Sequence, residues 1–283
     1  MLQIGRVQSL QVVKIKPHYA MLAGDDQHQA PLPIDELPDE CNEGDRIDAF
    51  VYLDSEDRLA ATTCEPKAQL GEVAWLKVVA VHHIGAFLDL GIPKDIFVAE
   101  REQFEPMQVG HSYAVYIYLD NLGRLAATPR LEEQLKEYSD YHYGDKVEGL
   151  ISARSQLGYQ VVIDNRYLGM LYHNEVFSRL TIGQTISAYV QKNREDGRLD
   201  LRLNKPGDYR LDALQQQIMD QLKQDGGYIA LSDKSDPKLI AAVFGVSKGQ
   251  YKKAIGHLYR QHLIQISSNG ILLNQDKNKQ ENS

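Results

Sequence analysis

The sequence predicts a mainly β protein with a C-terminal α/β part, and three observations support this fold class. A similar segment recurs three times along the 283 residues. Within each copy, apolar and polar residues tend to alternate with a period of two, which is typical of half-buried strands. From Asp208 onward the period changes to about 3.6, which indicates helices.

The repeat is defined by glycines and an arginine at nearly constant spacing. Its copies read GDRIDAFVYLDSEDRLAAT from Gly44, GHSYAVYIYLDNLGRLAAT from Gly110 and, more weakly, GQTISAYVQKNREDGRLDL from Gly183. A second glycine lies 39 residues before each of these, at Gly5, Gly71 and Gly144. A fixed internal period marks a repeated structural unit. We therefore expect three small modules rather than the two domains that the length alone suggests.

The strands are clearest in the second module. Strand-like runs cover Val73 to Val81, Ile84 to Leu90, Tyr113 to Leu119 and Arg124 to Thr128. About five short strands with a glycine turn near the middle favour a Greek-key barrel of the OB-fold type, and a small sandwich is the alternative. In the third module the alternation places Leu199, Leu201 and Leu203 on one side and Arg198, Asp200 and Arg202 on the outward side.

The C-terminal part reads as three helices followed by a β-hairpin. Leu211, Leu214, Ile218 and Leu222 form one helical stripe that ends at Gly226-Gly227. Asp236-Pro237 predicts the start of a second helix and Gly245 its end, while Ser247 caps a third, in which Tyr251, Ile255, Leu258 and His262 share a face. Asn269-Gly270 between two apolar runs is a hairpin signal. This order is that of a winged helix-turn-helix.

These patterns give a complete domain prediction. The expected parts are an acidic first barrel (1–66), a second barrel (67–130), a helical connector (131–143), a third barrel (144–206), a winged-helix domain (207–275) and a disordered tail (276–283).

The negative charge of the chain is concentrated at its N-terminus. Residues 1–66 carry 5 basic and 13 acidic side chains, a net charge of −8, whereas residues 206–283 carry 10 and 8, a net charge of +2. A polyanion would be repelled by the first module and tolerated by the later ones. Neither a membrane span nor a signal peptide is evident, so we expect a cytoplasmic protein without a membrane partner.

No constellation of residues indicates an enzyme. The adjacent His82 and His83 would point to opposite faces of a strand, and no third ligand completes a metal site. Phosphate-binding loops, nucleophile elbows and dinucleotide fingerprints are missing from the sequence. We therefore predict no catalytic residue, metal or cofactor.

Rings and cations interleave in the third module, as in surfaces that bind single-stranded nucleic acid. Tyrosines such as Tyr116, Tyr118 and Tyr189 fall on the outward phase of strands, although half-buried core positions are the alternative for each. The candidate RNA-binding residues of the third module are Arg154, Tyr159, Arg166, Tyr167, Tyr172, His173, Lys192, Arg194, Arg198 and Arg202.

The last predicted helix supplies a second candidate surface. Lys252, Lys253, His257 and Arg260 lie opposite its apolar stripe, and Lys248 lies one turn earlier. A winged helix usually presents this helix to nucleic acid. An ordinary solvated face of a protein-interaction module is the alternative.

The second module resembles the RNA-binding S-one domain of the largest ribosomal small-subunit protein. In its segment GEVAWLKVVAVHHIGAFLDLGIPKDIFV, Ile84 to Phe87 match that family's aromatic-Gly-x-Phe turn, and Val98 takes the place of its histidine. The resemblance makes Phe87 a secondary RNA-binding residue. In the third module, Leu157 to Gln160 occupy the turn, and Tyr172 can replace the stacking face of the histidine.

The order of domains is similar to that of the conserved virulence factor B (CvfB) family of Gram-positive bacteria. Three tandem modules, two of which carry YLD…RLAAT, precede a winged helix. The resemblance implies a cytoplasmic RNA-binding regulator of gene expression.

Three functions are compatible with these patterns. The first is a non-enzymatic, monomeric protein that binds single-stranded RNA through the third barrel and the winged helix and regulates genes after transcription. The second is a winged-helix regulator of transcription that binds duplex DNA. The third is an adaptor associated with the ribosome or with RNA-processing proteins, in which the acidic first module recognises a basic partner.

Overall fold

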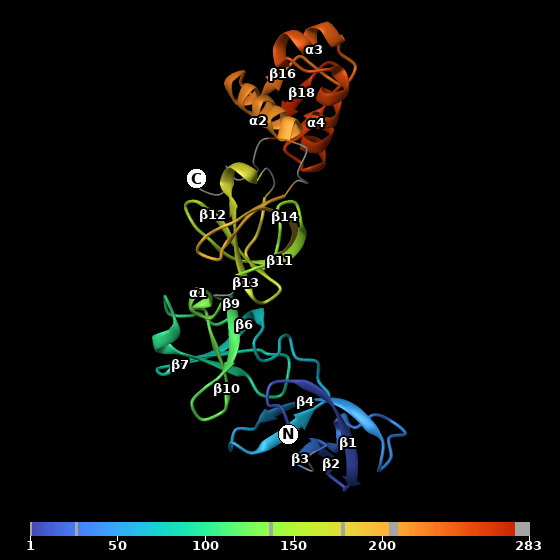
Figure 1. The fold of residues 1–283 in the computed structure, drawn as a ribbon, viewed down its shortest axis with the longest axis vertical. Helices are drawn as coiled ribbons and strands as arrows, with labels where there is room; N and C mark the ends of the chain where they lie inside the picture. The colour runs from blue at the N-terminus through green and yellow to red at the C-terminus, as the bar shows by residue number, and fades with distance from the viewer. Residues whose placement is uncertain (1, 26–27, 136–137, 177–178, 204–208, 275–283) are drawn as a thin grey trace, which may run out of the picture. The chain divides into compact units, whose positions relative to one another are not determined.

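The computed structural model describes residues 2–25, 28–135, 138–176, 179–203 and 209–274. Three five-stranded β units are followed by a helical domain with a small sheet (Figure 1). The predicted mainly β fold class with a C-terminal winged helix is confirmed. Among the described residues, no helix is both long enough and apolar enough to cross a membrane.

The first unit is a five-stranded sheet whose outer strands meet. Its elements are β1 (Val7–Ile15), β2 (Tyr19–Ala23), β3 (Gln29–Pro33), the 3-10 helix η1 (Ile34–Glu36), β4 (Arg46–Leu53) and β5 (Leu59–Thr62). The strand order is β3-β2-β1-β4-β5, and β3 also contacts β5. Alternate residues such as Leu10, Leu22, Leu32 and Val51 fill its core.

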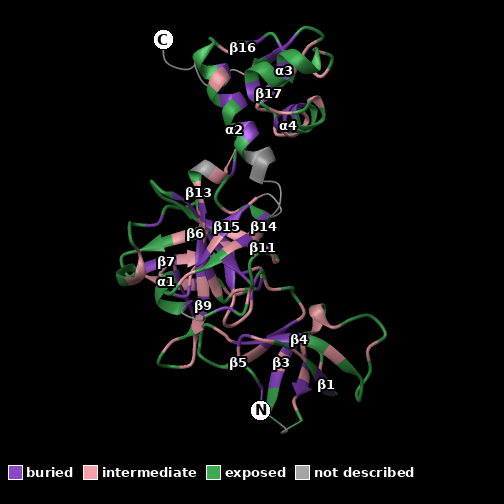
Figure 2. Ribbon diagram, turned by 45° about the horizontal axis from the view of Figure 1, so that its top comes forward, coloured by how far each residue is buried: buried purple, intermediate pink, exposed green. Residues whose placement is uncertain are grey.

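The second and third units are closed barrels, which makes the alternative of a sandwich wrong. The second consists of β6 (Val73–His82), β7 (Gly85–Leu88), β8 (Ile96–Ala99), η2 (Glu100–Glu102), β9 (Ser112–Leu119) and β10 (Leu125–Thr128). The third consists of β11 (Lys146–Arg154), β12 (Gly158–Ile163), β13 (Tyr167–Tyr172), η3 (His173–Glu175), β14 (Thr185–Asn193) and β15 (Leu199–Arg202). Buried residues lie along the strands and exposed residues along most connections (Figure 2).

One glycine of each repeated pair makes the same backbone turn in every barrel. Gly5, Gly71 and Gly144 have positive φ angles of 79°, 81° and 92°, a region that favours glycine. The N–H of each donates to the fourth strand of its barrel, to the carbonyls of Val51 (2.7 Å), Ile117 (2.8 Å) and Val190 (2.8 Å). The glycine period in the sequence therefore reports a repeated turn that starts each barrel.

The YLD…RLAAT motif locks the last hairpin of the first two barrels. The Asp54 carboxylate accepts from the backbone N–H and the guanidinium of Arg58, and Asp120 accepts the same bonds from Arg124. The closing threonine donates its hydroxyl to the last residue of the 3-10 helix, Thr62 to Glu36 and Thr128 to Glu102. The motif is thus explained by structure and stabilises the turn and the end of the barrel.

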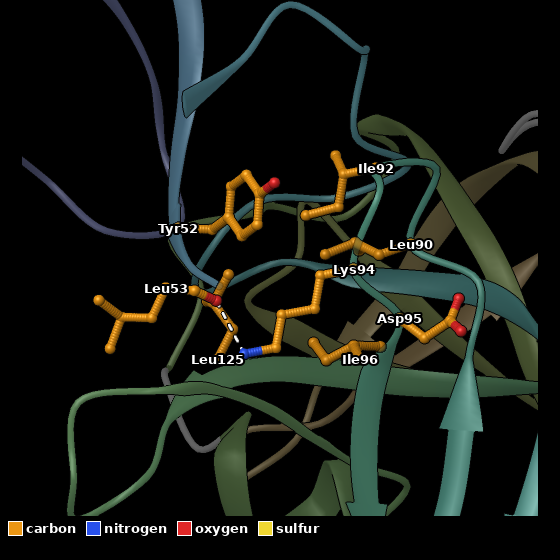
Figure 3. A pocket seen from close by; sticks show the side chains of 8 residues that line it. All are labelled: Tyr52, Leu53, Leu90, Ile92, Lys94, Asp95, Ile96 and Leu125. Carbon is orange, nitrogen blue, oxygen red and sulfur yellow. Dashed lines mark hydrogen bonds between the residues drawn. The ribbon is translucent and has the colours of Figure 1, made fainter. Parts of the chain in front are cut away.

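The first two barrels share a hydrophobic core within one compact unit of the chain. Phe50 and Tyr52 of β4 belong to the same buried cluster as Leu90 and Ile92 of the second barrel. Beside them, the Lys94 Nζ donates to the carbonyl of Leu53 at 2.7 Å (Figure 3). It also donates to the carbonyl of Asp54 at 2.7 Å. Burial lowers the pKa of this lysine, although nearby carboxylates oppose the effect.

The connector between the second and third barrels contains a single helical turn, α1 (Leu131–Gln134). Among its described residues, the helical connector predicted over 131–143 therefore contains only this short helix, and Tyr138 is exposed outside it. Leu131 and Leu135 pack with Val162 and Leu168 of the β12–β13 hairpin and with residues of the second barrel.

The C-terminal domain contains α2 (Tyr209–Gln224), β16 (Tyr228–Ile229), α3 (Pro237–Phe244), α4 (Lys248–Arg260), β17 (Ile264–Ile266) and β18 (Ile271–Leu273). The predicted caps of α3 and α4 are confirmed: the Asp236 side chain accepts from the N–H of Lys238, and Ser247 forms a capping box with Gln250. Strand β16, which the sequence did not predict, pairs with β18. His262 lies after α4 rather than on its buried face, because the chain turns there with a φ of 57°.

Two expectations for this region lie outside the described residues. They are the disordered tail at 276–283 and the side chain of Leu211 in the stripe of α2.

Candidate nucleic-acid interface

Three rings gather on the outer side of the second barrel. Phe87 of β7 lies directly across from Phe97 of β8, with ring centroids 5.2 Å apart. The ring of His82, at the end of β6, lies nearly perpendicular to that of Phe87, with centroids 5.6 Å apart and an interplanar angle of 88°. His82 is exposed and both phenylalanines are partly exposed. We call these three residues the ring cluster.

The ring cluster depends on a close backbone approach at Gly85. A Cβ atom placed there would lie 2.2 Å from the carbonyl oxygen of Val98 and 2.7 Å from the ring of Phe97. Any other residue would push β7 away from β8 and separate the two phenylalanines. The glycine of the aromatic-Gly-x-Phe pattern is therefore a requirement of strand packing.

The third barrel repeats this approach at Gly158. A Cβ atom there would lie 2.1 Å from the carbonyl oxygen of Leu171 and 2.8 Å from the Cα of Tyr172. In the second barrel, Gly85 is paired with Ala99. Tyr172 therefore corresponds to Ala99 and not to Val98, so the two residues that were both matched to the family's histidine do not occupy equivalent positions. Val98 is fully buried and points to the core.

Tyr159 is a core residue rather than an open stacking platform. Its exposed fraction is 6%. The ring centroids of His173 and Tyr159 lie 5.5 Å apart at an interplanar angle of 75°, and the guanidinium of Arg154 lies 5.7 Å from the Tyr159 centroid. Arg154 and His173 are exposed themselves, so they cover the ring and keep their polar atoms at the surface.

Tyr172 lies in a polar network on the third barrel. Its hydroxyl donates to Asp200 Oδ1 at 3.1 Å, and that carboxylate lies 3.9 Å from the guanidinium of Arg194. Burial, followed by the charge of Asp200, raises the pKa of the Tyr172 hydroxyl, so it remains a donor at neutral pH. The ring is partly exposed and held in one orientation by this bond.

The outward orientation predicted for Arg202 is wrong, because its exposed fraction is only 2%. Arg202 follows Arg198 by four residues, as Thr62 follows Arg58 and Thr128 follows Arg124. Its guanidinium lies 4.0 Å from Glu175, the last residue of η3, just as the two threonines contact the last residues of η1 and η2. The alternation of the strand was interpreted correctly, but the outer side is covered at this position.

The other predicted cations and rings of the third barrel reach the surface to different extents. Arg166 and Lys192 are exposed, and Tyr167 is partly exposed. Arg194 and Arg198 are about one third exposed and lie 3.0 Å and 3.9 Å from the shared carboxylate of Asp196. Arg194 occupies the position of Asp54 and Asp120, so this turn lacks the Asp–Arg lock of the first two barrels.

In the winged helix, α4 has the predicted division into two faces. Its ribbon carries both buried and exposed segments (Figure 2). Its buried residues are Tyr251, Ala254, Ile255 and Leu258. The five candidate residues are exposed or partly exposed: Lys248, Lys252, Lys253, His257 and Arg260. The helix therefore presents positive charge to solvent and apolar residues to the core of its domain.

Two members of the ring cluster were not predicted as binding residues. His82 was considered only as a metal ligand, and Phe97 was quoted only as part of a strand. The sequence gives no orientation for Phe97, because residues 96–99 (IFVA) are all apolar. In the structure Phe97 lies between two buried residues of β8 and points outward beside Phe87.

Parts of the sequence match two known families of domains. The sequence matches the S1 domain family over residues 4–64 and 70–130, and the family described as the CvfB-like winged helix domain over residues 216–273. The chain combines S1 domains with a CvfB-like winged helix. Both are nucleic-acid-binding domains, and the predicted resemblance to the CvfB family is confirmed.

Similar proteins occur in Staphylococcus saprophyticus, Bacillus subtilis and Streptococcus pneumoniae. The conserved virulence factor B of Staphylococcus saprophyticus is 28% identical to this chain, over 96% of this chain and 95% of that protein. Bacillus subtilis YitL is also 28% identical, over 80% and 78% of the two chains. A solved multidomain protein with nucleic acid binding domains from Streptococcus pneumoniae is 25% identical, covers 96% of this chain and 98% of its own, and has a TM-score of 0.45.

Proposed function

We propose that this protein binds single-stranded RNA and regulates gene expression after transcription, acting on transcripts in the cytoplasm. The observation that supports the proposal most strongly is the ring cluster on an S1 domain, since exposed rings stack on unpaired bases. The cations of the third barrel and of α4 would bind phosphates. In this proposal the second barrel contributes the three rings of the ring cluster, whereas the sequence predicted Phe87 alone.

The contribution of the rings is tested by substitution. Phe87→Ala and Phe97→Ala should each weaken binding of a labelled oligouridine by about 1–3 kcal/mol, the typical value of one stacked base. Phe104→Ala is the matched control, because Phe104 is 71% exposed on the same barrel and packs on Arg130 outside the ring cluster. Fluorescence anisotropy measures the three affinities. Equal losses in all three variants, or none, would contradict a stacking role.

The contribution of the cations is tested with salt. Each phosphate contact with a single strand contributes about −0.7 to the slope of log affinity against log salt, so roughly five contacts predict a slope of roughly −3.5. Arg194→Ala and Arg198→Ala should each make the slope shallower by about 0.7. Binding of poly-U that does not change with salt would exclude the proposed phosphate contacts.

Duplex DNA is a second candidate ligand, favoured by the exposed cations of α4. A recognition helix of this kind enters the major groove. Competition between duplex DNA and single-stranded RNA of the same sequence in a gel shift distinguishes the two ligands. We expect RNA to compete more strongly, and Lys252→Ala to weaken DNA binding without affecting the contribution of the ring cluster.

A further inference from the structure

The first barrel carries an open groove on the face that bears the ring cluster in the second barrel. The groove has a volume of about 620 Å³ and is lined by residues of β2, β3, β4 and β5 and of the adjoining turns. The strand register gives the correspondence: Met21 pairs with Pro31 in the first barrel as Phe87 pairs with Phe97 in the second. The same barrel face is thus present without the phenylalanines.

The floor of this groove is apolar and stiff. Pro31 and Pro33 alternate along β3, so both rings lie on the groove side together with Tyr19 and Met21. Proline rings lose little conformational entropy when a ligand covers them, and methionine adapts to ligands of different shape. Such a surface suits the apolar side chains of a peptide.

The electrostatic surroundings of the groove select against nucleic acid. Residues 1–66 have a net charge of −8, and Asp35, which follows Pro33 by two residues, is exposed. The positive charge of Arg58, which lines the groove, is balanced by Asp54 at 2.9 Å and Glu56 at 2.8 Å, and Lys16 is held over the ring of Tyr19 at 4.8 Å. A polyanion would be repelled, whereas a positively charged segment would be attracted.

We propose that the groove over β2, β3 and β5 of the first barrel binds an extended, basic peptide segment of a partner protein. Apolar side chains of the peptide lie on Met21, Pro31 and Pro33, and its lysines or arginines face the acidic surface of this barrel. The interaction is independent of RNA binding, because it uses a different barrel and the opposite charge.

The preferred peptide is found by selecting a phage-displayed library of random dodecamers on the full chain. We expect the enriched sequences to combine lysine or arginine with leucine, proline or aromatic residues. Enrichment of acidic sequences, or failure to enrich any sequence, would overturn the proposal.

The site is then tested with the best synthetic peptide by fluorescence anisotropy. Met21→Lys should weaken binding by about tenfold or more, and Phe87→Ala, at the corresponding position of the second barrel, should leave it unchanged. Pro33→Lys is a second variant on the same floor, in case Met21→Lys lowers the melting temperature. Unchanged affinity in both groove variants, or a loss in Phe87→Ala, would place the peptide elsewhere.

Two further measurements identify the occupant. Asp35→Lys should weaken peptide binding and make it less sensitive to salt, because one attractive charge is reversed. Oligouridine binding should be the same for Met21→Lys and the unsubstituted chain. If oligouridine binding falls instead, the groove belongs to the RNA surface and the proposal is wrong.

Discussion

Arg202 shows how one side chain can be misassigned when strand alternation is considered alone. It lies in an outward phase, yet the end of the barrel covers it and its guanidinium approaches Glu175. Alignment of the three copies would have placed it with Thr62 and Thr128, which are also buried. The repeat therefore contained the information that periodicity lacked.

We expect Arg202→Ala to destabilise the third barrel by about 2–4 kcal/mol, because it removes a buried side chain and leaves Glu175 without this neighbour. Arg198→Ala, the control, should change stability by less than about 0.5 kcal/mol because it is a surface substitution. Urea denaturation followed by circular dichroism measures both. Arg202→Thr, which supplies the hydroxyl present in the other barrels, should be less destabilising than Arg202→Ala; the reverse order would contradict the proposed equivalence.

The ring cluster was only partly predictable from single residues. Phe87 follows from the family pattern, but its neighbours His82 and Phe97 become a cluster only when three strands are brought together. Tyr159 was misleading because a tyrosine in a strand can belong to the core, and here His173 and Arg154 cover it.

At the scale of single elements, strands and caps were predicted well because their signals are local. Alternation defined the strands of the second barrel, and Asp236-Pro237 and Ser247 defined two helix starts. The two-residue strand β16 was missed, since it exists only through its pairing with β18. The helix after Thr128 was overestimated because tertiary contacts of Leu131 and Leu135 need only one turn.

We expect the stability of the first barrel to depend on pH, because the Asp54 carboxylate holds its last hairpin through hydrogen bonds from Arg58. The backbone N–H of Arg58, together with its guanidinium, lowers the pKa of Asp54 below the ordinary value of 3.8. Since the folded-state pKa is depressed, the stabilisation is complete above about pH 4 and is lost as the pH falls through the lowered value. Asp54→Asn should abolish this part of the acid transition.

NMR titration of the Asp54 carboxyl carbon checks the direction of the shift, and thermal melts between pH 2 and pH 7 check its effect on stability. Asp39→Asn, in the acidic loop after η1, is the control and should leave the acid transition unchanged. A midpoint for Asp54 at or above its ordinary value would refute the lock.

For the whole molecule, the order of three barrels and a winged helix follows from the repeat and the change of period. The contact between the first two barrels does not follow from the sequence. Lys94 lies in a loop whose composition predicts a solvated side chain, yet it donates to the backbone carbonyls of Leu53 and Asp54 in the first barrel. No local pattern announces a contact between residues some 40 positions apart.

We predict that the first two barrels unfold in one cooperative transition. Lys94→Ala removes both hydrogen bonds to the first barrel and should lower the stability of this transition by roughly 1–3 kcal/mol. Lys77→Ala, an exposed residue of β6, is the control. Hydrogen exchange would show protection lost together in β4 and β7; loss confined to one barrel would mean that the barrels unfold independently.

The joint core also restricts how the chain can be divided for experiments. Truncation after residue 66 would separate Phe50 and Tyr52 from Leu90 and Ile92 and expose these buried apolar side chains to water. A fragment that lacks the first barrel would tend to aggregate. A loss of binding by that fragment would then reflect damage to the second barrel and not the function of the first. Point substitutions on the outer surface avoid this problem, and an exchange between relatives should keep the first two barrels together with α1, which packs on the second barrel.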